Sequence, residues 1–159
     1  MTTQSVDRVA LAHASLARLA DQRGDVTVPV LERYYAVMPD ARRSFIDHGL
    51  GDVAGLEARM VAESFYLLLR WVEEPSATRI DQATTIVHHN DTLAIGPRWY
   101  LGLVDAALEV LLETVPPKAV DEQAMWQELR REIALFIDSL RPEFLRTIDA
   151  DPVANGHAS

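Results

Sequence analysis

The sequence predicts a single-domain, all-α fold of about six or seven helices. Apolar residues recur at three- and four-residue spacing along most of the chain, which is the period of an amphipathic helix and not the two-residue period of a strand. Prolines and glycines interrupt this pattern at intervals that suit individual helices. At 159 residues the chain can bury the core of one ordinary domain, and it contains no internal repeat and no Gly-rich phosphate loop.

The first two helices are separated near Gly24. Apolar residues at helical spacing predict a first helix that ends at this glycine. Asp25 or Thr27 can cap a second helix, and Pro29 is tolerated in its first turn because the N–H that proline lacks would have no partner there. Pro39 is expected to end the second helix, because a proline does not continue a helix that precedes it.

A short helix, a loop and a central helix follow. Residues 39–45 predict a short connecting helix, and residues 48–52 predict a loop that two glycines punctuate. The segment 56–72 is the most hydrophobic of the chain. It predicts a helix that is apolar around much of its circumference and therefore lies centrally. Pro75 follows this helix.

The second half of the chain predicts three further helices and a tail. Residues 78–90 form a more polar helix that should pack less tightly than its neighbours. A strongly apolar helix begins at Pro97 and is closed by the pair Pro116–Pro117. A long last helix follows before the apolar pattern fades. We therefore expect a domain over residues 1–147 and a flexible C-terminal tail over residues 148–159.

Composition narrows the classes of function. The formal net charge of −9 opposes approach to phosphate backbones, so we expect no nucleic-acid partner. No apolar run approaches the roughly 20 residues that span a bilayer, and residues 1–5 lack the features of a secretory signal, so we expect no membrane association and a cytoplasmic location. The sequence has no cysteine, which leaves its five histidines as the obvious strong ligands for a transition metal.

Residues 30–45, with the sequence VLERYYAVMPDARRSF, resemble the second and third helices of the globin family. In globins a proline opens the short third helix, and a phenylalanine six residues later packs on the face of the haem. Pro39 and Phe45 stand at this spacing. The resemblance implies that Phe45 stacks against a haem.

A second stretch, HHNDTLAIGPRWYLGLVDAALEVLL over residues 88–112, resembles the globin segment around the proximal histidine. Globins place an aliphatic residue six positions after that histidine, a proline at eight and an aromatic residue at eleven. These intervals are reproduced by His89, Ile95, Pro97 and Tyr100. The sequence IGPRWYLG is also similar to the corresponding segment of bacterial sensor globins.

The resemblance covers residues 5–147 in helix order and implies a globin fold that binds haem b. His89 is then the proximal ligand to the iron, with His88 as the alternative. Neighbouring side chains point about 100° apart on a helix, so only one of the two can face the pocket. A ligating imidazole binds the metal through one ring nitrogen and donates its other N–H to a carbonyl.

The other walls of the expected pocket come from Leu31 and from the front half of the central helix. Two registers of that helix are open: Leu56 with Met60, or Glu57 with Val61, could face the ligand. The candidate cofactor-binding residues are Phe45, Leu31, Leu56, Met60, Ile95 and Tyr100.

The resemblance implies a module that binds diatomic gases, either as a sensor that reports to a separate signalling partner or as a small carrier of oxygen or nitric oxide. We expect no enzymatic activity, because nitric oxide dioxygenation needs an electron source and no flavin or nicotinamide domain fits in the chain. The last two long helices carry apolar residues on a broad arc, and related sensor globins pair through them. A homodimer through these helices is therefore a candidate assembly.

A globin-fold signalling or interaction domain that works without haem is the alternative. Thr85, four residues before His89, stands where globins usually carry an apolar residue. Neither register of the central helix provides a distal histidine or glutamine, although Tyr34 or Tyr35 could supply a hydrogen-bond donor from the second helix. The colour of the purified protein distinguishes the two functions.

Overall fold

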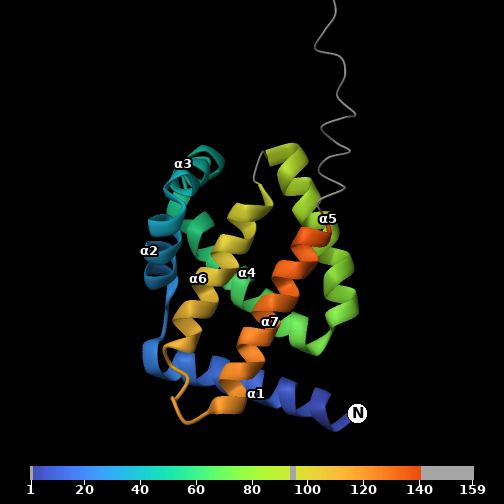
Figure 1. Cartoon of the computed structure of the whole chain (residues 1–159). Coiled ribbons are helices and arrows are strands. Elements are labelled where there is room, and N and C mark those ends of the chain that lie inside the picture. Colours follow the sequence, from blue (N-terminus) through green and yellow to red (C-terminus); the bar gives the residue numbers. More distant parts are fainter. Residues whose placement is uncertain (1, 94–95, 141–159) are drawn as a thin grey trace, which may run out of the picture.

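The computed structural model describes residues 2–93 and 96–140 of the chain (Figure 1). Within these residues it contains seven helices and no strand, which confirms the predicted all-α fold and is consistent with a globin-like arrangement. The helices are α1 (Thr2–Arg23), α2 (Thr27–Val37), α3 (Pro39–His48), α4 (Val53–Glu73), α5 (Pro75–Leu93), α6 (Pro97–Leu112) and α7 (Val120–Ser139). The end of the predicted domain, residues 141–147, and the predicted tail, residues 148–159, lie outside the described residues.

Aspartate side chains fix the start of two helices. The carboxylate of Asp25 accepts a hydrogen bond of 2.9 Å from the N–H of Thr27, the first residue of α2. The carboxylate of Asp52 accepts one of 3.0 Å from the N–H of Gly55 in the first turn of α4. Both carboxylates satisfy N–H groups that have no partner within the helix itself.

Prolines open three of the helices. Pro39, Pro75 and Pro97 are the first residues of α3, α5 and α6, where the missing N–H costs no intrahelical hydrogen bond. The sequence predicts that α5 begins at residue 78, because apolar periodicity becomes visible only there. Pro75 starts this helix earlier than the periodicity indicates.

Helix α3 ends later than the sequence predicts. Residues 48–52 are predicted to form a loop, whereas His48 is the last residue of α3. The backbone leaves right-handed geometry at Leu50 and Gly51, whose φ angles are 50° and 89°. Glycine adopts this left-handed conformation without a steric penalty, so the turn falls after His48 and carries this histidine on the helix.

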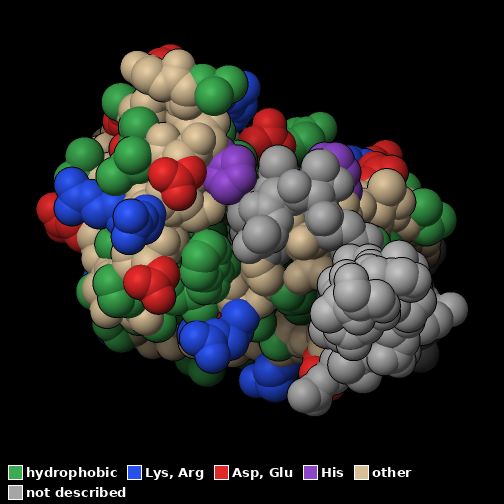
Figure 2. Space-filling model, turned by 90° about the horizontal axis from the view of Figure 1, so that it is seen from above, with side chains coloured by type: hydrophobic (Ala, Val, Ile, Leu, Met, Phe, Trp, Pro, Cys, Tyr) green, Lys and Arg blue, Asp and Glu red, His purple; other side chains and the backbone are tan. Residues whose placement is uncertain are grey.

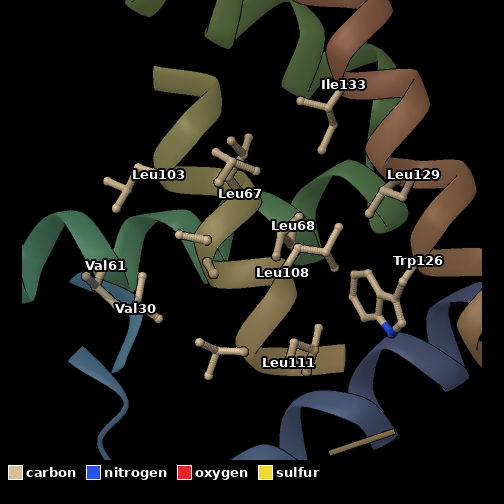
Figure 3. Packing of buried hydrophobic residues seen from close by; sticks show 14 of the residues in the cluster. Val30, Val61, Leu67, Leu68, Leu103, Leu108, Leu111, Trp126, Leu129 and Ile133 are labelled. Carbon is tan, nitrogen blue, oxygen red and sulfur yellow. The ribbon is translucent and has the colours of Figure 1, made fainter. Parts of the chain in front are cut away.

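Helix α6 lies in the middle of the fold and packs against α1, α2, α4, α5 and α7 (Figure 1). Figure 3 shows Leu103, Leu108 and Leu111 of α6 among apolar side chains from neighbouring helices. Leu108 and Leu111 are buried, as are Leu68 of α4 and Leu129 of α7. Burial of each such side chain stabilises the folded chain by roughly 1.5–3 kcal/mol, so the packing of α6 against α4 and α7 contributes strongly to stability.

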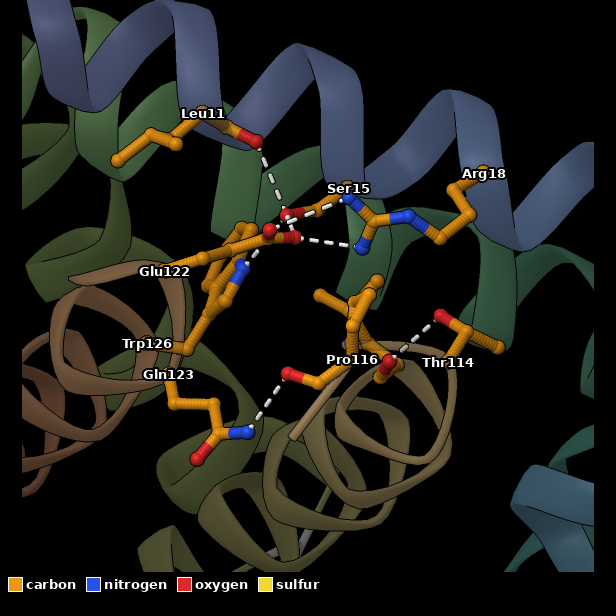
Figure 4. A network of polar contacts seen from close by, with 9 residues as sticks. Leu11, Ser15, Arg18, Thr114, Pro116, Glu122, Gln123 and Trp126 are labelled. Atoms are coloured by element: carbon orange, nitrogen blue, oxygen red, sulfur yellow. Dashed lines mark hydrogen bonds and ion pairs between the residues drawn. The ribbon is translucent and has the colours of Figure 1, made fainter. Parts of the chain in front are cut away.

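Four polar side chains join α1 to α7 inside the protein (Figure 4). Glu122 is buried, and it accepts hydrogen bonds of 2.7 and 3.1 Å from Arg18 and a further one from the hydroxyl of Ser15. The indole N–H of Trp126 donates to the Ser15 hydroxyl oxygen at 2.9 Å. Burial raises the pKa of Glu122, but the hydrogen bonds from Arg18 and Ser15 outweigh burial and hold this pKa below its ordinary value.

Helix α5 buries few of its side chains. Among residues 75–90, the buried side chains are Thr78 and Ile86. This agrees with the sequence prediction of a polar helix that packs less tightly than its neighbours. A helix held by few buried contacts opens more readily than the rest of a domain.

The apolar residues of α6 and α7 are used mostly inside the domain. Seven residues of α6 are buried, and the large exposed apolar side chains of α7 are Val120 and Leu135. The predicted homodimer through these helices therefore stays a prediction, without a broad exposed apolar face on the described residues to support it. None of the described helices is long and apolar enough to cross a membrane.

The Glu122 network generates the first prediction. Changing Glu122→Gln removes the charge that Arg18 and Ser15 stabilise, and we expect the free energy of unfolding to fall by about 1–3 kcal/mol. Urea unfolding followed by circular dichroism measures this change. The matched control is Glu128→Gln, at an exposed position of the same helix, which should change stability by less than about 0.5 kcal/mol.

The same pair of variants tests the pH dependence. Because the pKa of Glu122 is lower in the folded chain than its ordinary value of 4.5, its stabilising contribution is present above pH 4.5 and is lost as the pH falls through the folded-state pKa. The Glu122→Gln variant should therefore lose less stability on acidification than the wild type. If the wild type and Glu122→Gln lose the same amount of stability as the pH falls, the carboxylate of Glu122 does not contribute to the pH dependence of stability.

Candidate functional site

A cavity of about 450 Å³ opens among four helices. Its walls come from α3, α4, α5 and α6, and α2 contributes Tyr34. This volume is within the range of roughly 300–1,000 Å³ that is typical of small-molecule pockets. Five of the candidate residues from the sequence line it: Phe45, Leu56, Met60, His89 and Tyr100.

His89 is held on the α5 wall by its own helix. Its Nδ1 atom lies 2.7 Å from the backbone carbonyl oxygen of Thr85, one turn earlier. A carbonyl can only accept a hydrogen bond, so Nδ1 is the protonated nitrogen and donates. In the neutral ring the other nitrogen, Nε2, then carries the lone pair, which is the form in which imidazole binds metals.

The other histidine candidate from this part of the sequence, His88, does not line the cavity. His88 is exposed, and its ring packs edge-on against that of His89 with centroids 6.1 Å apart. The side chains of the two histidines therefore differ in exposure as adjacent positions of a helix should. Ile95 lies outside the described residues.

Tyr100 links α6 to the same face of α5. Its ring packs edge-on against the imidazole of His89 at a centroid distance of 6.2 Å, and its hydroxyl donates a hydrogen bond to Oε1 of Gln82. Burial raises the pKa of Tyr100 above its usual range, and the nearby carboxylate of Glu63 raises it further. The phenol therefore stays protonated and keeps its role as a donor to Gln82.

Of the two registers that the sequence leaves open for the central helix, α4 shows the one with Leu56 and Met60 toward the cavity. Leu56 and Met60 line the cavity. Glu57 is absent from the lining and accepts a hydrogen bond of 2.7 Å from the hydroxyl of Tyr35, while Val61 is buried in the core. Leu31, the remaining candidate, is also buried in the core and does not line the cavity.

An aromatic cluster supports Phe45. The ring of Phe45 meets those of Tyr34 and Tyr35 edge-on, with centroid distances of 6.4 and 6.1 Å. Tyr34 lines the cavity, and its hydroxyl donates to the backbone carbonyl of Trp99 at 2.9 Å. Tyr35 does not line the cavity. Phe45 is thus fixed between α2 and the cavity by rings on two sides.

Charged and polar side chains also line the cavity, and Arg59 and Gln82 among them are residues that the sequence alone does not single out. They include Arg59, Arg70, His48 and Gln82. Arg70 pairs with Asp81 at 3.1 Å. These residue types are common on any solvated helix face, so only their position around one cavity distinguishes them.

The chain was compared with protein-family models, with curated proteins and with solved structures, and none of them matches it. The assignment of a role to the cavity therefore depends on its chemistry.

The Tyr100–Gln82 contact generates a prediction about α5. Changing Tyr100→Phe removes one hydrogen bond, worth about 1 kcal/mol, between this loosely packed helix and α6. We expect amide hydrogen exchange in α5 to become about fivefold faster, while exchange in α7 does not change. Tyr66→Phe, at an exposed tyrosine, is the control. Unchanged exchange in α5 of the Tyr100→Phe variant would show that the contact does not hold this helix.

Proposed function

We propose that the cavity binds one haem b, with Nε2 of His89 as the protein ligand to the iron. The observation that carries the proposal is the hydrogen bond from His89 Nδ1 to the Thr85 carbonyl. It leaves Nε2 as the metal-binding nitrogen and fixes the orientation of the ring. The proposal is further supported by the position of His89 on the wall of a cavity that is mostly apolar in its lining.

The single imidazole of His89 is a better match for the iron of a porphyrin than for a free metal ion. Among residues 2–93 and 96–140, no cluster of three or more His, Asp or Glu side chains could hold a metal ion. A porphyrin brings four nitrogen ligands of its own, so a single imidazole suffices as the proximal protein ligand. Phe45, Leu56 and Met60 offer apolar surface to the macrocycle, and Arg59 and Arg70 offer positive charge to its carboxylates.

When bound, the haem supplies an iron that takes up diatomic gases. The residues of the chain hold and shield this group. His89 binds it, Thr85 orients the imidazole, and Tyr100 restricts the movement of the ring from the neighbouring helix. The apolar side chains of the α4 wall, Leu56 and Met60, offer the macrocycle a surface from which its binding displaces water.

Two hydroxyl groups on the cavity wall already donate elsewhere. Ser64 donates to the carbonyl of Met60 at 2.9 Å, and Tyr34 donates to that of Trp99 at 2.9 Å. Oxygen bound to haem iron is held best by a hydrogen-bond donor, whereas carbon monoxide and nitric oxide depend less on one. This favours a gas sensor that reports to a separate partner over an oxygen store, because a sensor needs only a ligand-dependent change of conformation.

Haem titration tests the proposal. Addition of haem to the purified protein should give a Soret band that saturates at one haem per chain, and carbon monoxide should shift the band of the reduced form. Weak binding without saturation would favour the alternative, a globin-fold signalling or interaction domain that works without haem.

Two adjacent histidines provide a matched pair of variants for the same titration. His89→Ala should weaken haem binding by at least about tenfold, since it removes the metal-binding nitrogen. Added imidazole should restore the spectrum of the reduced protein. His88→Ala should bind haem as the wild type does, because His88 does not line the cavity. The opposite pattern would identify His88 as the ligand.

A further inference from the structure

A second histidine lines the same cavity. His48 is the last residue of α3, and its side chain is exposed at the cavity wall. The sequence predicts an ordinary solvated loop residue at this position. The turn at Gly51 instead leaves His48 on the helix and on the wall of the cavity.

His48 and His89 are anchored in the same way. Nδ1 of His48 lies 2.8 Å from the carbonyl oxygen of Ser44, one turn earlier, just as Nδ1 of His89 lies 2.7 Å from that of Thr85. Nδ1 of His48 also lies 3.3 Å from the hydroxyl oxygen of Ser44, but the carbonyl is the shorter contact. A carbonyl can only accept, so in the neutral form of each ring Nδ1 donates to it and Nε2 carries the lone pair. Two metal-binding nitrogens therefore belong to the lining of one cavity.

The two histidines come from different sides of the cavity. Helix α3 packs on α2 and α4, whereas α5 packs on α4 and α6. In Figure 1, α3 and α5 lie on either side of α4 and α6. Figure 2 shows the molecule from above, with histidine surface (purple) exposed on this face. A planar ligand that fills the cavity can therefore be approached by an imidazole from each side.

Met60 and Glu63 are further side chains of the α4 wall that can bind a metal. Iron accepts imidazole nitrogen readily, whereas a thioether is a softer donor that suits copper(I) better. His48 is also exposed, so its ring can turn about the Nδ1 anchor without leaving a packed core. These two properties favour His48 over Met60 as a second ligand.

We propose that His48 supplies a second axial nitrogen, so that the iron is held between His48 and His89. The inference rests on the proposed haem site. His89 is the permanent ligand, because Tyr100 also restricts its ring. His48 is the exchangeable ligand, which an external gas must displace. Gas binding would then release α3 from the bound group, which gives a sensor a ligand-dependent change at its surface.

The experiment uses the full chain loaded with haem. Absorption and electron paramagnetic resonance spectra of the oxidised protein should show a six-coordinate low-spin iron at neutral pH. His48→Gln should convert it to the high-spin form, and free imidazole should restore the low-spin spectrum. The control variant is His13→Gln, which should keep the wild-type spectrum, because His13 lies on α1 and pairs with Glu73 at 2.7 Å. Met60→Leu, at a residue of the haem pocket, tests the other candidate ligand. In the reduced protein, His48→Gln should accelerate carbon monoxide binding by about tenfold, as expected if His48 occupies the iron about nine-tenths of the time.

Each other outcome overturns the inference. A wild-type protein that binds haem in the high-spin form, or a His48→Gln variant that stays low-spin, would show that His48 is not a ligand while the haem site stands. Loss of the low-spin form in Met60→Leu would assign the ligand to Met60. A chain that takes up no haem at one-to-one stoichiometry would overturn both the haem site and this inference. Circular dichroism of His48→Gln, which changes an exposed side chain, verifies that the variant is folded.

Discussion

Helix α6 packs against five other helices, and its burial determines where a cavity can form. Its second half is enclosed by the core, where Ala107 and Leu111 have no exposed surface. Its first turns, which carry Trp99 and Tyr100, line the cavity instead. Helix α5, which buries few side chains, forms one wall of the cavity and leaves the space beside the first turns of α6 unfilled. The same arrangement thus provides a rigid core at one end of α6 and an accessible apolar space at the other.

In the candidate site, backbone carbonyl groups orient the histidine side chains. The carbonyl oxygen of Thr85 lies 2.7 Å from Nδ1 of His89 and favours a proton on that nitrogen in the neutral ring, and the carbonyl of Ser44 is placed in the same way at 2.8 Å from Nδ1 of His48. Both interactions span one turn of a helix, so they form as soon as the helix forms and require no distant partner. Tyr100 adds the long-range restraint, because it bonds Gln82 and packs on His89 from α6. A site built in this way is organised before any ligand binds.

Much of the fold could be predicted from local sequence signals, whereas the place of His48 and the partner of Tyr100 in the candidate site could not. Proline positions and apolar periodicity located the helices, because both act within a few residues of the chain. The position of His89 on the cavity wall was expected from the resemblance of residues 88–112 to globins, and not from a local signal of helix register. The role of His48 depends on where the left-handed turn at Gly51 begins, and the pairing of Tyr100 with Gln82 depends on how two helices meet. Such contacts are set by tertiary packing, which no local pattern encodes.

The proposed haem site depends on a backbone that holds the His89 imidazole with its metal-binding nitrogen free. Nitrogen NMR of the haem-free chain with ¹⁵N-labelled histidine, at a pH about two units above the ordinary histidine pKa, reports directly which ring nitrogen carries the proton. The signal of His89 is assigned as the one that disappears in the His89→Ala variant. We expect a neutral ring that is protonated at Nδ1. A ring protonated mainly at Nε2 would contradict it, because the metal-binding nitrogen would then be Nδ1, which faces the Thr85 carbonyl.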